Sequence, residues 1–219
     1  MPIEDVLNRQ HSQWEGTYSE EPYLYGESPS YGARKAARLF RGEGAKRILE
    51  LGCGHGRDTL YFAKNGMKVH AVDFSRTAIE AMTKKANELS LSEPIAGLCH
   101  DVREPLPFAK NSFDGCYSHM LYCMALTSDQ LARLTTEIRG ILKPNGLNIY
   151  TARNTKDKHY GKGIHRGEDM YEVDGFIVHF LSEGKMAELA RGFKVLSVEE
   201  FEEGNLPRRL SLVTLRKQP

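Results

Sequence analysis

Three glycines at alternate positions and one acidic residue are the features of this sequence that most directly indicate chemistry. The apolar run Ile48-Leu49-Glu50-Leu51 stops in Gly52-Cys53-Gly54-His55-Gly56, so backbone without side chains must come close to another group there. A second apolar run ends in Asp73, about 20 residues after the first glycine, where nucleotide-binding folds place the carboxylate that binds ribose hydroxyls. Together the two features predict a ligand that contains adenosine.

The glycine spacing excludes two common phosphate-binding loops. A dinucleotide fold requires G-x-G-x-x-G, but Arg57 stands at the third glycine position and Gly56 comes one residue early. A Walker-type loop requires Gly-Lys-Ser/Thr after its glycines, and the residues there are Arg57-Asp58-Thr59. A structural alternative stays open at this point, in which the glycines form only a strand-to-helix turn and Asp73 caps the helix beginning near Ser75.

The run E-L-G-C-G-x-G from Glu50 to Gly56 resembles motif I of the class I methyltransferases that use S-adenosylmethionine, and the acidic end of the second strand resembles its partner motif. The cofactor of that family carries no phosphate. Its charged amino-acid end and its sulfonium suit carboxylates and exposed backbone. After the third strand, His100-Asp101-Val102 resembles the adenine-binding motif of the family. The resemblance implies that S-adenosylmethionine, with S-adenosylhomocysteine as the product, is bound by Glu50, Gly52, Cys53, Gly54, Asp73, Phe74, Asp101, Val102 and Ser118.

Further motifs extend the resemblance toward the C-terminus. Leu106-Pro107-Phe108 followed by Ser112-Phe113-Asp114 matches the approach to the fourth strand, and Leu142-Lys143-Pro144-Asn145-Gly146 matches the turn into the fifth. The helix from Arg57 and the hairpin-closed C-terminus are similar to methyltransferases of types 11 and 25, and most of all to the small tellurite-resistance and thiopurine-type group. The tellurite-resistance proteins close with a His-Arg pair where this chain has Leu206-Pro207-Arg208-Arg209, so we do not expect an identical substrate.

The residues just past the fourth strand occupy the family's usual position for groups that face the transferred methyl. His119 and Tyr122 are the catalytic candidates there, and His119 could act as a general base near neutral pH. The alternative is that His119 only packs against the cofactor or contacts it through its backbone. At the end of the fifth strand, Tyr150 and Arg153 could orient a substrate, although an Arg beside a polar loop is often simply solvated. The predicted substrate contacts are Tyr25, Tyr150, Arg153 and Arg208.

Aromatic residues are concentrated near the N-terminus. The segments Trp14-Glu15-Gly16-Thr17-Tyr18 and Tyr25-Gly26-Glu27-Ser28-Pro29 are similar to W-x-x-x-Y and Y-G-x-x-P segments that border the cofactor cleft in the family. Either these residues roof the cofactor, with Trp14 and Tyr18 in contact with it, or they staple two helices to the sheet. The sequence leaves both possibilities open.

Composition restricts the class of partner. The chain has 219 residues and a mass of 24.7 kDa, with 30 basic and 29 acidic residues, so its overall charge gives no electrostatic signature for nucleic acid or an anionic membrane. No run approaches about 18 uninterrupted apolar residues, and we expect a cytoplasmic protein, monomeric or homodimeric. The four cysteines form no C-x-x-C pair and the histidines of 153–175 lack zinc-ligand spacing, so no metal site is predicted.

Apolar periodicity alternates between helices and strands, which predicts a sheet layered between helices. The expected helices are 3–14, 30–40, 57–64, 75–89, 128–142 and 181–190. The expected strands are 47–51, 67–73, 95–99, 113–118, 147–151, 193–201 and 209–215, the last two joined by a turn at 204–207.

With the resemblance, this pattern indicates an α/β, Rossmann-like doubly wound sheet of seven strands, mainly parallel with an antiparallel C-terminal hairpin strand. We expect an N-terminal helical extension over residues 1–44 and an S-adenosylmethionine-binding methyltransferase domain over 45–219. Within that domain, the polar segment 153–175 is long for a connection, which suggests a lid over the substrate.

These patterns predict transfer of the methyl group of S-adenosylmethionine to a nitrogen, oxygen or sulfur atom of a small molecule. Two alternatives stay open, namely a protein substrate and a non-catalytic module that binds the cofactor or a partner. A nucleic-acid substrate is disfavoured, because Ser118-His119-Met120-Leu121 stands where methyltransferases of base amines carry an Asn/Asp-Pro-Pro-aromatic tetrad, and the chain has no Pro-Cys pair.

Overall fold

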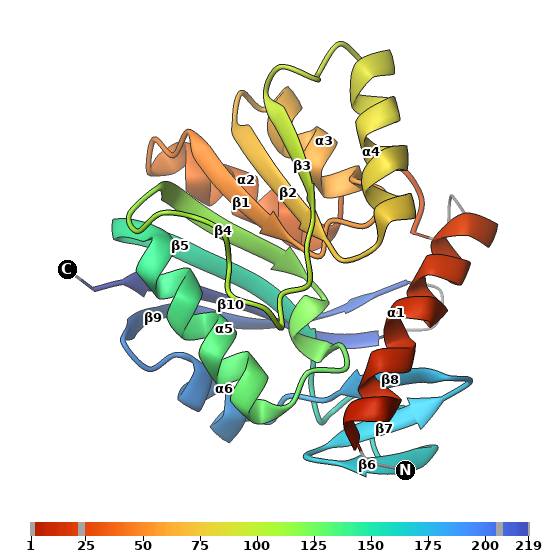
Figure 1. Cartoon of the computed structure of the whole chain (residues 1–219). Helices are drawn as coiled ribbons and strands as arrows, with labels where there is room; N and C mark the ends of the chain where they lie inside the picture. Colours follow the sequence, from red (N-terminus) through yellow and green to blue (C-terminus); the bar gives the residue numbers. More distant parts are fainter. Residues whose placement is uncertain (1–2, 22–24, 205–207, 219) are drawn as a thin grey trace.

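The computed structural model describes residues 3–21, 25–204 and 208–218 of the chain. Its centre is a seven-stranded sheet with the order β3-β2-β1-β4-β5-β10-β9 (Figure 1). The first five strands pair in parallel, and β10 pairs antiparallel with both β5 and β9. This confirms the predicted α/β, mainly parallel, doubly wound sheet. The strands are β1 Arg47–Leu51, β2 Lys68–Asp73, β3 Ile95–Cys99, β4 Phe113–His119, β5 Leu142–Arg153, β9 Phe193–Glu203 and β10 Arg208–Lys217.

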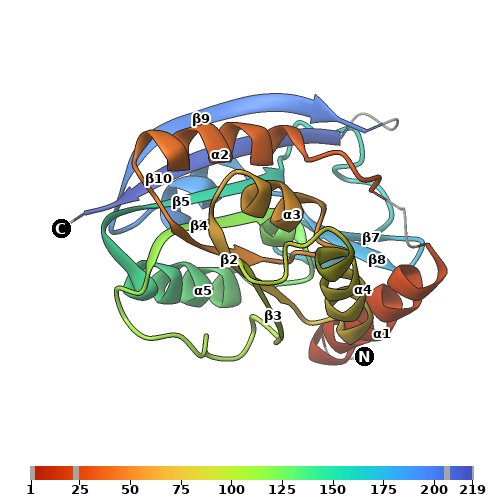
Figure 2. The same cartoon turned by 90° about the horizontal axis from the view of Figure 1, so that it is seen from above.

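Helices cover both faces of the sheet, because neighbouring residues of its buried strands point in opposite directions. Ile48 of β1 packs with α2, α3 and α4 on one face, whereas Leu49 packs with α5 and α6 on the other (Figures 1 and 2). Side chains of Ser30, Ser75 and Thr127 cap the first turns of α2, α4 and α5. These helices are α2 Tyr31–Gly42, α3 Arg57–Lys64, α4 Arg76–Glu88, α5 Ser128–Ile141 and α6 Glu183–Leu189.

The fifth strand begins earlier than predicted. The segment Lys143-Pro144-Asn145-Gly146, expected to form a turn, is part of β5. It interrupts the pairing with β4, since Phe113 lies opposite Leu142 while Gly115 lies opposite Leu147. Asn145 has a left-handed φ of 64°. The turn residues recognised in the sequence therefore form a bulge inside the strand.

The C-terminal strands extend beyond their predicted ends. β10 pairs with β9 along its whole length, from Arg208 opposite Glu203 to Lys217 opposite Phe193. Of the turn predicted at 204–207, residues 205–207 lie outside the described part of the chain. The long pairing places Glu203 at the end of β9 that lies nearest this turn.

The polar segment 153–175 contains regular structure that was not predicted. Together with the residues that follow, it forms a separate three-stranded antiparallel sheet of β6 Ile164–Gly167, β7 Met170–Val173 and β8 Phe176–His179. Met170 and Ile177 of this small sheet are buried in one cluster with Val6 and Leu7 from the N-terminal helix. Its function as a substrate lid stays a prediction.

The N-terminal helix, α1 Ile3–Glu20, continues past its predicted end at residue 14. It lies at the side of the sheet, against α4 and beside β7 and β8 (Figures 1 and 2). α2 is different, because Phe40 on its inner side is fully buried against the sheet. The predicted extension 1–44 thus consists of one helix that belongs to the core and one that borders it, and its status as a separate unit stays a prediction.

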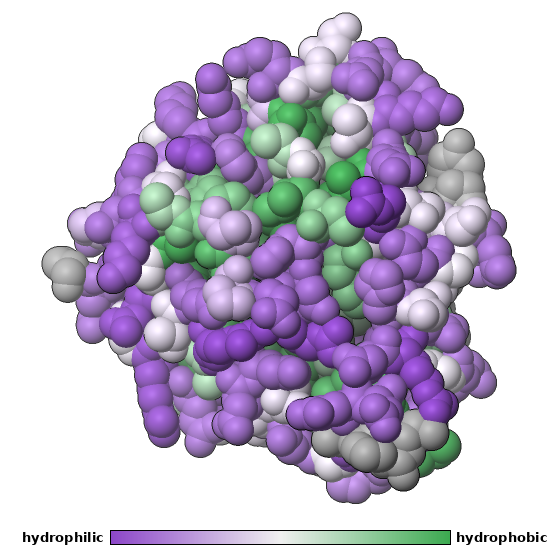
Figure 3. Space-filling model, in the orientation of Figure 1, coloured by the Kyte–Doolittle hydropathy of each residue, from purple (hydrophilic) through white to green (hydrophobic). Residues whose placement is uncertain are grey.

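Hydrophilic residues cover most of the face seen in Figure 3, including α5 and α1. Hydrophobic residues on this face gather over β3 and the segment that follows it. β3 is an edge strand, and its residues Ala96 and Gly97 are exposed. Within the described ranges, no helix has both the length and the apolar character needed to span a membrane.

A single glycine lets α2 pack closely against β4. A Cβ atom added at Gly115 would lie 2.3 Å from Cε1 of Phe40. We predict that Gly115→Ala lowers the free energy of unfolding by about 1–3 kcal/mol, because the ring must shift within a packed core. The matched control is Gly140→Ala in α5, where a Cβ atom meets nothing within 4 Å and alanine favours the helix by roughly 0.5–1 kcal/mol. Urea denaturation measures the free energy of unfolding of both variants. Equal values for Gly115→Ala and Gly140→Ala would contradict the close packing of Phe40 on Gly115.

Candidate functional site

One large cavity opens at the carboxyl ends of the parallel strands, where doubly wound sheets bind ligands. Its volume is about 1220 Å³ including its open mouth. Residues at or just after the ends of β1, β2, β3 and β4 line it, and α1 closes one side. The predicted cofactor contacts that line the cavity are Trp14, Tyr18, Glu50, Gly52, Cys53, Gly54, Asp73, Phe74, Asp101 and Val102.

The glycine loop runs from β1 into α3 with left-handed backbone at three positions. φ is 72° at Gly52, 51° at Gly54 and 79° at Gly56, a conformation that residues with side chains rarely adopt. The amides of Gly52 and Cys53 both donate to the carbonyl of Val72, at 2.8 and 3.1 Å. The loop is therefore held against the end of β2.

Two of these glycines also lie in tight contacts with side chains. A Cβ atom at Gly54 would lie 3.0 Å from Oη of Tyr18, which lines the cavity. A Cβ atom at Gly56 would lie 2.1 Å from Cγ of Met82 in α4. Gly56 thus serves the packing of two helices, whereas Gly54 lets the loop approach the aromatic side of the cavity.

Asp73 is buried at the end of β2 and joins two segments. Its Oδ2 accepts a hydrogen bond from the amide of Gly54 at 2.8 Å, and its Oδ1 accepts one from the amide of Ser75 at 3.0 Å. Burial raises the pKa of Asp73 to about 6, although both amides favour the ionised form. Ser75 caps the first turn of α4, Asp73 accepts the amide of that capping residue, and the carboxyl group of Asp73 faces the cavity.

Glu50 is the second buried carboxyl group of the cavity. It is 2% exposed, and its Oε2 accepts a hydrogen bond from the hydroxyl of Thr59 at 2.6 Å. Burial, followed by the nearby Asp58, raises the pKa of Glu50 well above its usual range. A carboxyl group in this state gains most from a cationic ligand, because the ligand would offset the loss of solvation.

Asp101, which follows β3, is paired with a residue that the sequence analysis did not consider. Arg103 donates from Nη2 and Nε to Asp101 Oδ2, at 2.7 and 3.0 Å. Burial acts to raise the pKa of Asp101, but the bonds from Arg103 lower it below its usual value. Arg103 Nη1 also donates to Oδ1 of Asn8 in α1 at 2.8 Å. The signal in the sequence was a basic residue two positions after the acidic one.

Trp14 and Tyr18 lie one turn apart on the side of α1 that faces the cavity. Their ring centroids are 5.5 Å apart, and the ring of Trp14 also meets that of Phe176 in β8 at 5.1 Å. Burial raises the pKa of Tyr18 well above its usual range, so its hydroxyl stays protonated. These residues line the cavity and connect α1 to the small sheet, and their contact with a cofactor stays a prediction. Helical spacing would also have identified Leu7 and Gln10, which line the cavity as well.

His119, the last residue of β4, lines the cavity between two polar groups. Its Nδ1 lies 2.9 Å from Oγ1 of Thr151, and its Nε2 lies 3.3 Å from Oε2 of Glu203. Burial lowers the pKa of His119, so the imidazole is neutral near pH 7. Ser118, a predicted cofactor contact, is buried beside it and is not among the cavity-lining residues.

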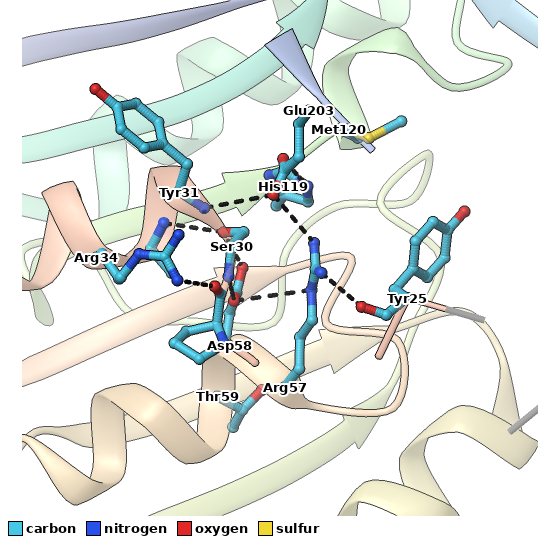
Figure 4. A network of polar contacts seen from close by, with 12 residues as sticks. Tyr25, Ser30, Tyr31, Arg34, Arg57, Asp58, Thr59, His119, Met120 and Glu203 are labelled. Carbon is cyan, nitrogen blue, oxygen red and sulfur yellow. Dashed lines mark hydrogen bonds and ion pairs between the residues drawn. The ribbon is translucent and has the colours of Figure 1, made fainter. Parts of the chain in front are cut away.

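Figure 4 shows the polar network beside this end of β4. Arg57 donates from Nη1 to the carbonyl of Tyr25 at 2.7 Å, and its Nη2 lies 3.9 Å from Oε1 of Glu203. Asp58 accepts hydrogen bonds from the amide and the hydroxyl of Ser30, both at 2.7 Å. The predicted substrate contact Tyr25 lines the cavity. Glu203 had no local signal in the sequence, because only the sheet brings the end of β9 to this place.

Besides Ser118, four further predicted residues are not among those that line the cavity in the described structure. Tyr122 and Tyr150 are fully buried and stack on each other, with ring centroids 4.0 Å apart and planes at 4°. Arg153 is 7% exposed and pairs with Asp157 at 2.6 Å. Arg208 begins β10. Their roles in catalysis or substrate binding stay predictions that no contact with the cavity supports.

The sequence profile of a family described as the methyltransferase domain matches residues 48–146. This segment contains the glycine loop, Asp73, Asp101 and His119, and it supplies most of the residues that line the cavity. This part of the chain is a methyltransferase domain. The narrower tellurite-resistance and thiopurine-type assignment stays a prediction.

Curated relatives share part of this methyltransferase. It is 31% identical to the biotin biosynthesis bifunctional protein BioHC of Saccharophagus degradans over 111 residues, which are 50% of this chain and 18% of that protein. It is 36% identical to phosphoethanolamine N-methyltransferase 1 of Triticum aestivum over 104 residues, 46% of this chain and 20% of that protein. The chain spans less than half the length of each of these relatives.

The fold extends over a solved structure of similar size. The 1,6-didemethyltoxoflavin-N1-methyltransferase of Burkholderia thailandensis superposes with a TM-score of 0.79 at 20% identity, covering 100% of this chain and 92% of that one. At this identity the likeness establishes the fold of the methyltransferase, including its C-terminal strands, and leaves its substrate open.

The buried carboxyl group of Glu50 lowers the stability of the methyltransferase without ligand. Its pKa is raised in the folded chain, so its contribution to stability decreases as the pH rises above about 4.5. We predict that Glu50→Gln increases the free energy of unfolding at pH 7, because the amide leaves no charge to be buried. Urea denaturation at pH 7 and pH 5 tests this, because the gain must shrink at the lower pH. An increase in the free energy of unfolding that is the same at both pH values would contradict the raised pKa of Glu50.

Proposed function

We propose that this methyltransferase transfers the methyl group of S-adenosylmethionine to a nitrogen, oxygen or sulfur atom of a small molecule. The observation that carries the proposal is that two buried carboxyl groups, Glu50 and Asp73, line one cavity together with the glycine loop. Such acceptors suit an adenosine ligand with a positively charged end, and they would repel a phosphate. The 1,6-didemethyltoxoflavin-N1-methyltransferase, whose structure holds S-adenosylhomocysteine and 1,6-didemethyltoxoflavin, supports the same assignment.

The residues of the cavity fit the parts of this cofactor. Asp73 would accept the ribose hydroxyls, and Asp101 would accept the adenine amino group beside its contact with Arg103. Phe74 and Val102 line the cavity and would provide apolar contacts for the adenine ring. The amino-acid end would lie against the glycine loop, near Glu50.

The bound cofactor supplies an activated methyl group, so the protein has to align the acceptor, exclude water and receive a proton. α1 excludes water on one side, through Trp14 and Tyr18. We assign proton acceptance to His119, because its imidazole is neutral near pH 7 and lines the cavity. Glu203 lies 3.3 Å from its Nε2 and would stabilise the imidazolium. Tyr122 has no part in this scheme, since its ring is stacked in the core.

A small acceptor fits this cavity better than a protein side chain does. α1 covers one side of the cavity and the polar network of Arg57 and His119 borders it, so the enclosed space suits a small polar molecule. The nearly balanced charge of the chain supports the same choice over nucleic acid. We extend the proposal to a cytoplasmic enzyme that acts as a monomer or a homodimer.

Calorimetry with S-adenosylmethionine and S-adenosylhomocysteine tests the cofactor site. We predict that the parent protein binds both, and that Asp73→Ala and Gly54→Val bind neither. The first variant removes the ribose acceptor, and the second forces a side chain toward Tyr18 Oη from a left-handed backbone. Gly140→Ala, remote from the cavity, is the control that keeps binding. Absence of binding by the folded parent would contradict the proposal. If the parent binds, a screen for methylated products distinguishes an enzyme from a module that only binds the cofactor.

The raised pKa of Asp73 makes cofactor binding depend on pH. Ribose hydroxyls donate best to the ionised carboxylate, and Asp73 ionises with a pKa of about 6. We predict that the affinity for S-adenosylhomocysteine rises between roughly pH 5 and 7, by up to about tenfold per unit below the pKa, and then levels off. Calorimetric titrations across this range measure the effect. Asp73→Asn, which cannot titrate, should remove the rise, and a flat profile for the parent would speak against this role of Asp73.

A further inference from the structure

α1 presents two neighbouring stripes of side chains to different parts of the molecule. One stripe, at helical spacing, lines the cavity and consists of Leu7, Gln10, Trp14 and Tyr18. The other stripe, His11 and Glu15, contacts the corner between β2 and α4. Glu15 stands between the two aromatic residues in the sequence, yet it is not among the residues that line the cavity.

Glu15 connects α1 to the first turn of α4. Its Oε1 accepts a hydrogen bond from the amide of Arg76 at 2.7 Å, and its Oε2 accepts one from the amide of Thr77 at 3.4 Å. The first amides of a helix lack partners within the helix, and a carboxylate there also opposes the positive end of the helix dipole. Burial acts to raise the pKa of Glu15, but these hydrogen bonds lower it, so the group stays ionised.

The corner that receives Glu15 also carries residues of the proposed cofactor site. His11 donates from Nε2 to the carbonyl of Phe74 at 3.2 Å, and its ring meets the ring of Phe74 at 5.1 Å. In the same corner, the amide of Ser75 donates to Asp73. Asp73 and Phe74 both line the cavity. α1 is therefore attached to the segment that supplies these two residues.

The other side of α1 is held by the small sheet. Gln10 donates from Nε2 to the carbonyl of Gly175 at 2.8 Å, and the amide of Ile177 donates to its Oε1 at 3.1 Å. The ring of Trp14 meets that of Phe176. α1 thus bridges β8 and α4 (Figure 1), and Glu15 supplies an ionised contact on the α4 side.

We propose that Glu15 is a positioning residue for cofactor binding, which holds α1 against α4 and thereby places Trp14 and Tyr18 over the bound cofactor. This inference rests on the proposed function. Because α1 closes one side of the cavity, the cofactor leaves when α1 separates from α4, and loss of the Glu15 contact makes that separation faster. The dissociation rate of the product therefore depends on a carboxylate outside the cavity.

Stopped-flow displacement of S-adenosylhomocysteine tests the inference, with the fluorescence of Trp14, the single tryptophan of the chain, as the signal. Glu15→Ala should raise the dissociation rate about fivefold, the factor that corresponds to the typical cost of removing a helix-capping group. Glu15→Gln keeps an acceptor but loses the charge, so its effect should be smaller. Glu20→Ala and Glu20→Gln, made at an exposed position in the last turn of the same helix, should dissociate at the parent rate.

Acrylamide quenching of Trp14 in the ligand-free variants separates this inference from the proposed function. Stronger quenching in the Glu15 variants than in the Glu20 variants supports the docking of α1 by Glu15 without use of the cofactor. Quenching and dissociation rates equal to those of the parent would overturn the inference while the cofactor site stands. Absence of S-adenosylhomocysteine binding by the parent would overturn the proposed function and the cofactor role of Glu15. If Glu15→Ala does not fold, Glu15→Gln carries the same comparison.

Discussion

The carboxyl group of Asp73 is the point on which the rest of the site depends. It accepts one amide from the glycine loop and one from the start of α4, so β1, β2 and α4 meet around one buried side chain. Hydrogen bonds to two amides offset part of the cost of burying a carboxylate, and the remaining cost is visible in its raised pKa. α1 contacts the same corner through His11 and Glu15. The glycine loop, α4 and α1 are therefore all held at the end of β2.

The order of the strands explains why distant residues meet at one edge. β1 lies between β2 and β4. The chain runs from β1 to β2 on one side and from β4 to β5 on the other, and this divergence opens a crevice at the carboxyl ends of β1 and β4. Glu50, Asp73 and His119 reach the crevice from β1, β2 and β4. Glu203 reaches it from much later in the sequence, because two successive antiparallel pairings turn β9 back to the direction of β5.

The two sides of the cavity differ in how they are built. One side comes from residues 48–146, which match the methyltransferase domain, and its shape follows from the glycine loop and the strand ends. The other side is formed by α1 together with Tyr25 and Gly26, which lie outside that segment. One fold can act on many different substrates, so residues 48–146 alone do not identify the methyl acceptor.

The sequence by itself determined the alternation of helices and strands, the glycine loop and the acidic residues 73 and 101, because each depends on backbone conformation or on spacing within one βαβ unit. It did not reveal the four-residue strands β6 to β8, whose polar residues lack a clear alternation. Nor did it show that Tyr150 stacks in the core, or that Glu15 and Glu203 contact α4 and His119. Only the tertiary structure decided these contacts, because strand order, register and helix docking set the partner of a side chain, and no local pattern encodes them.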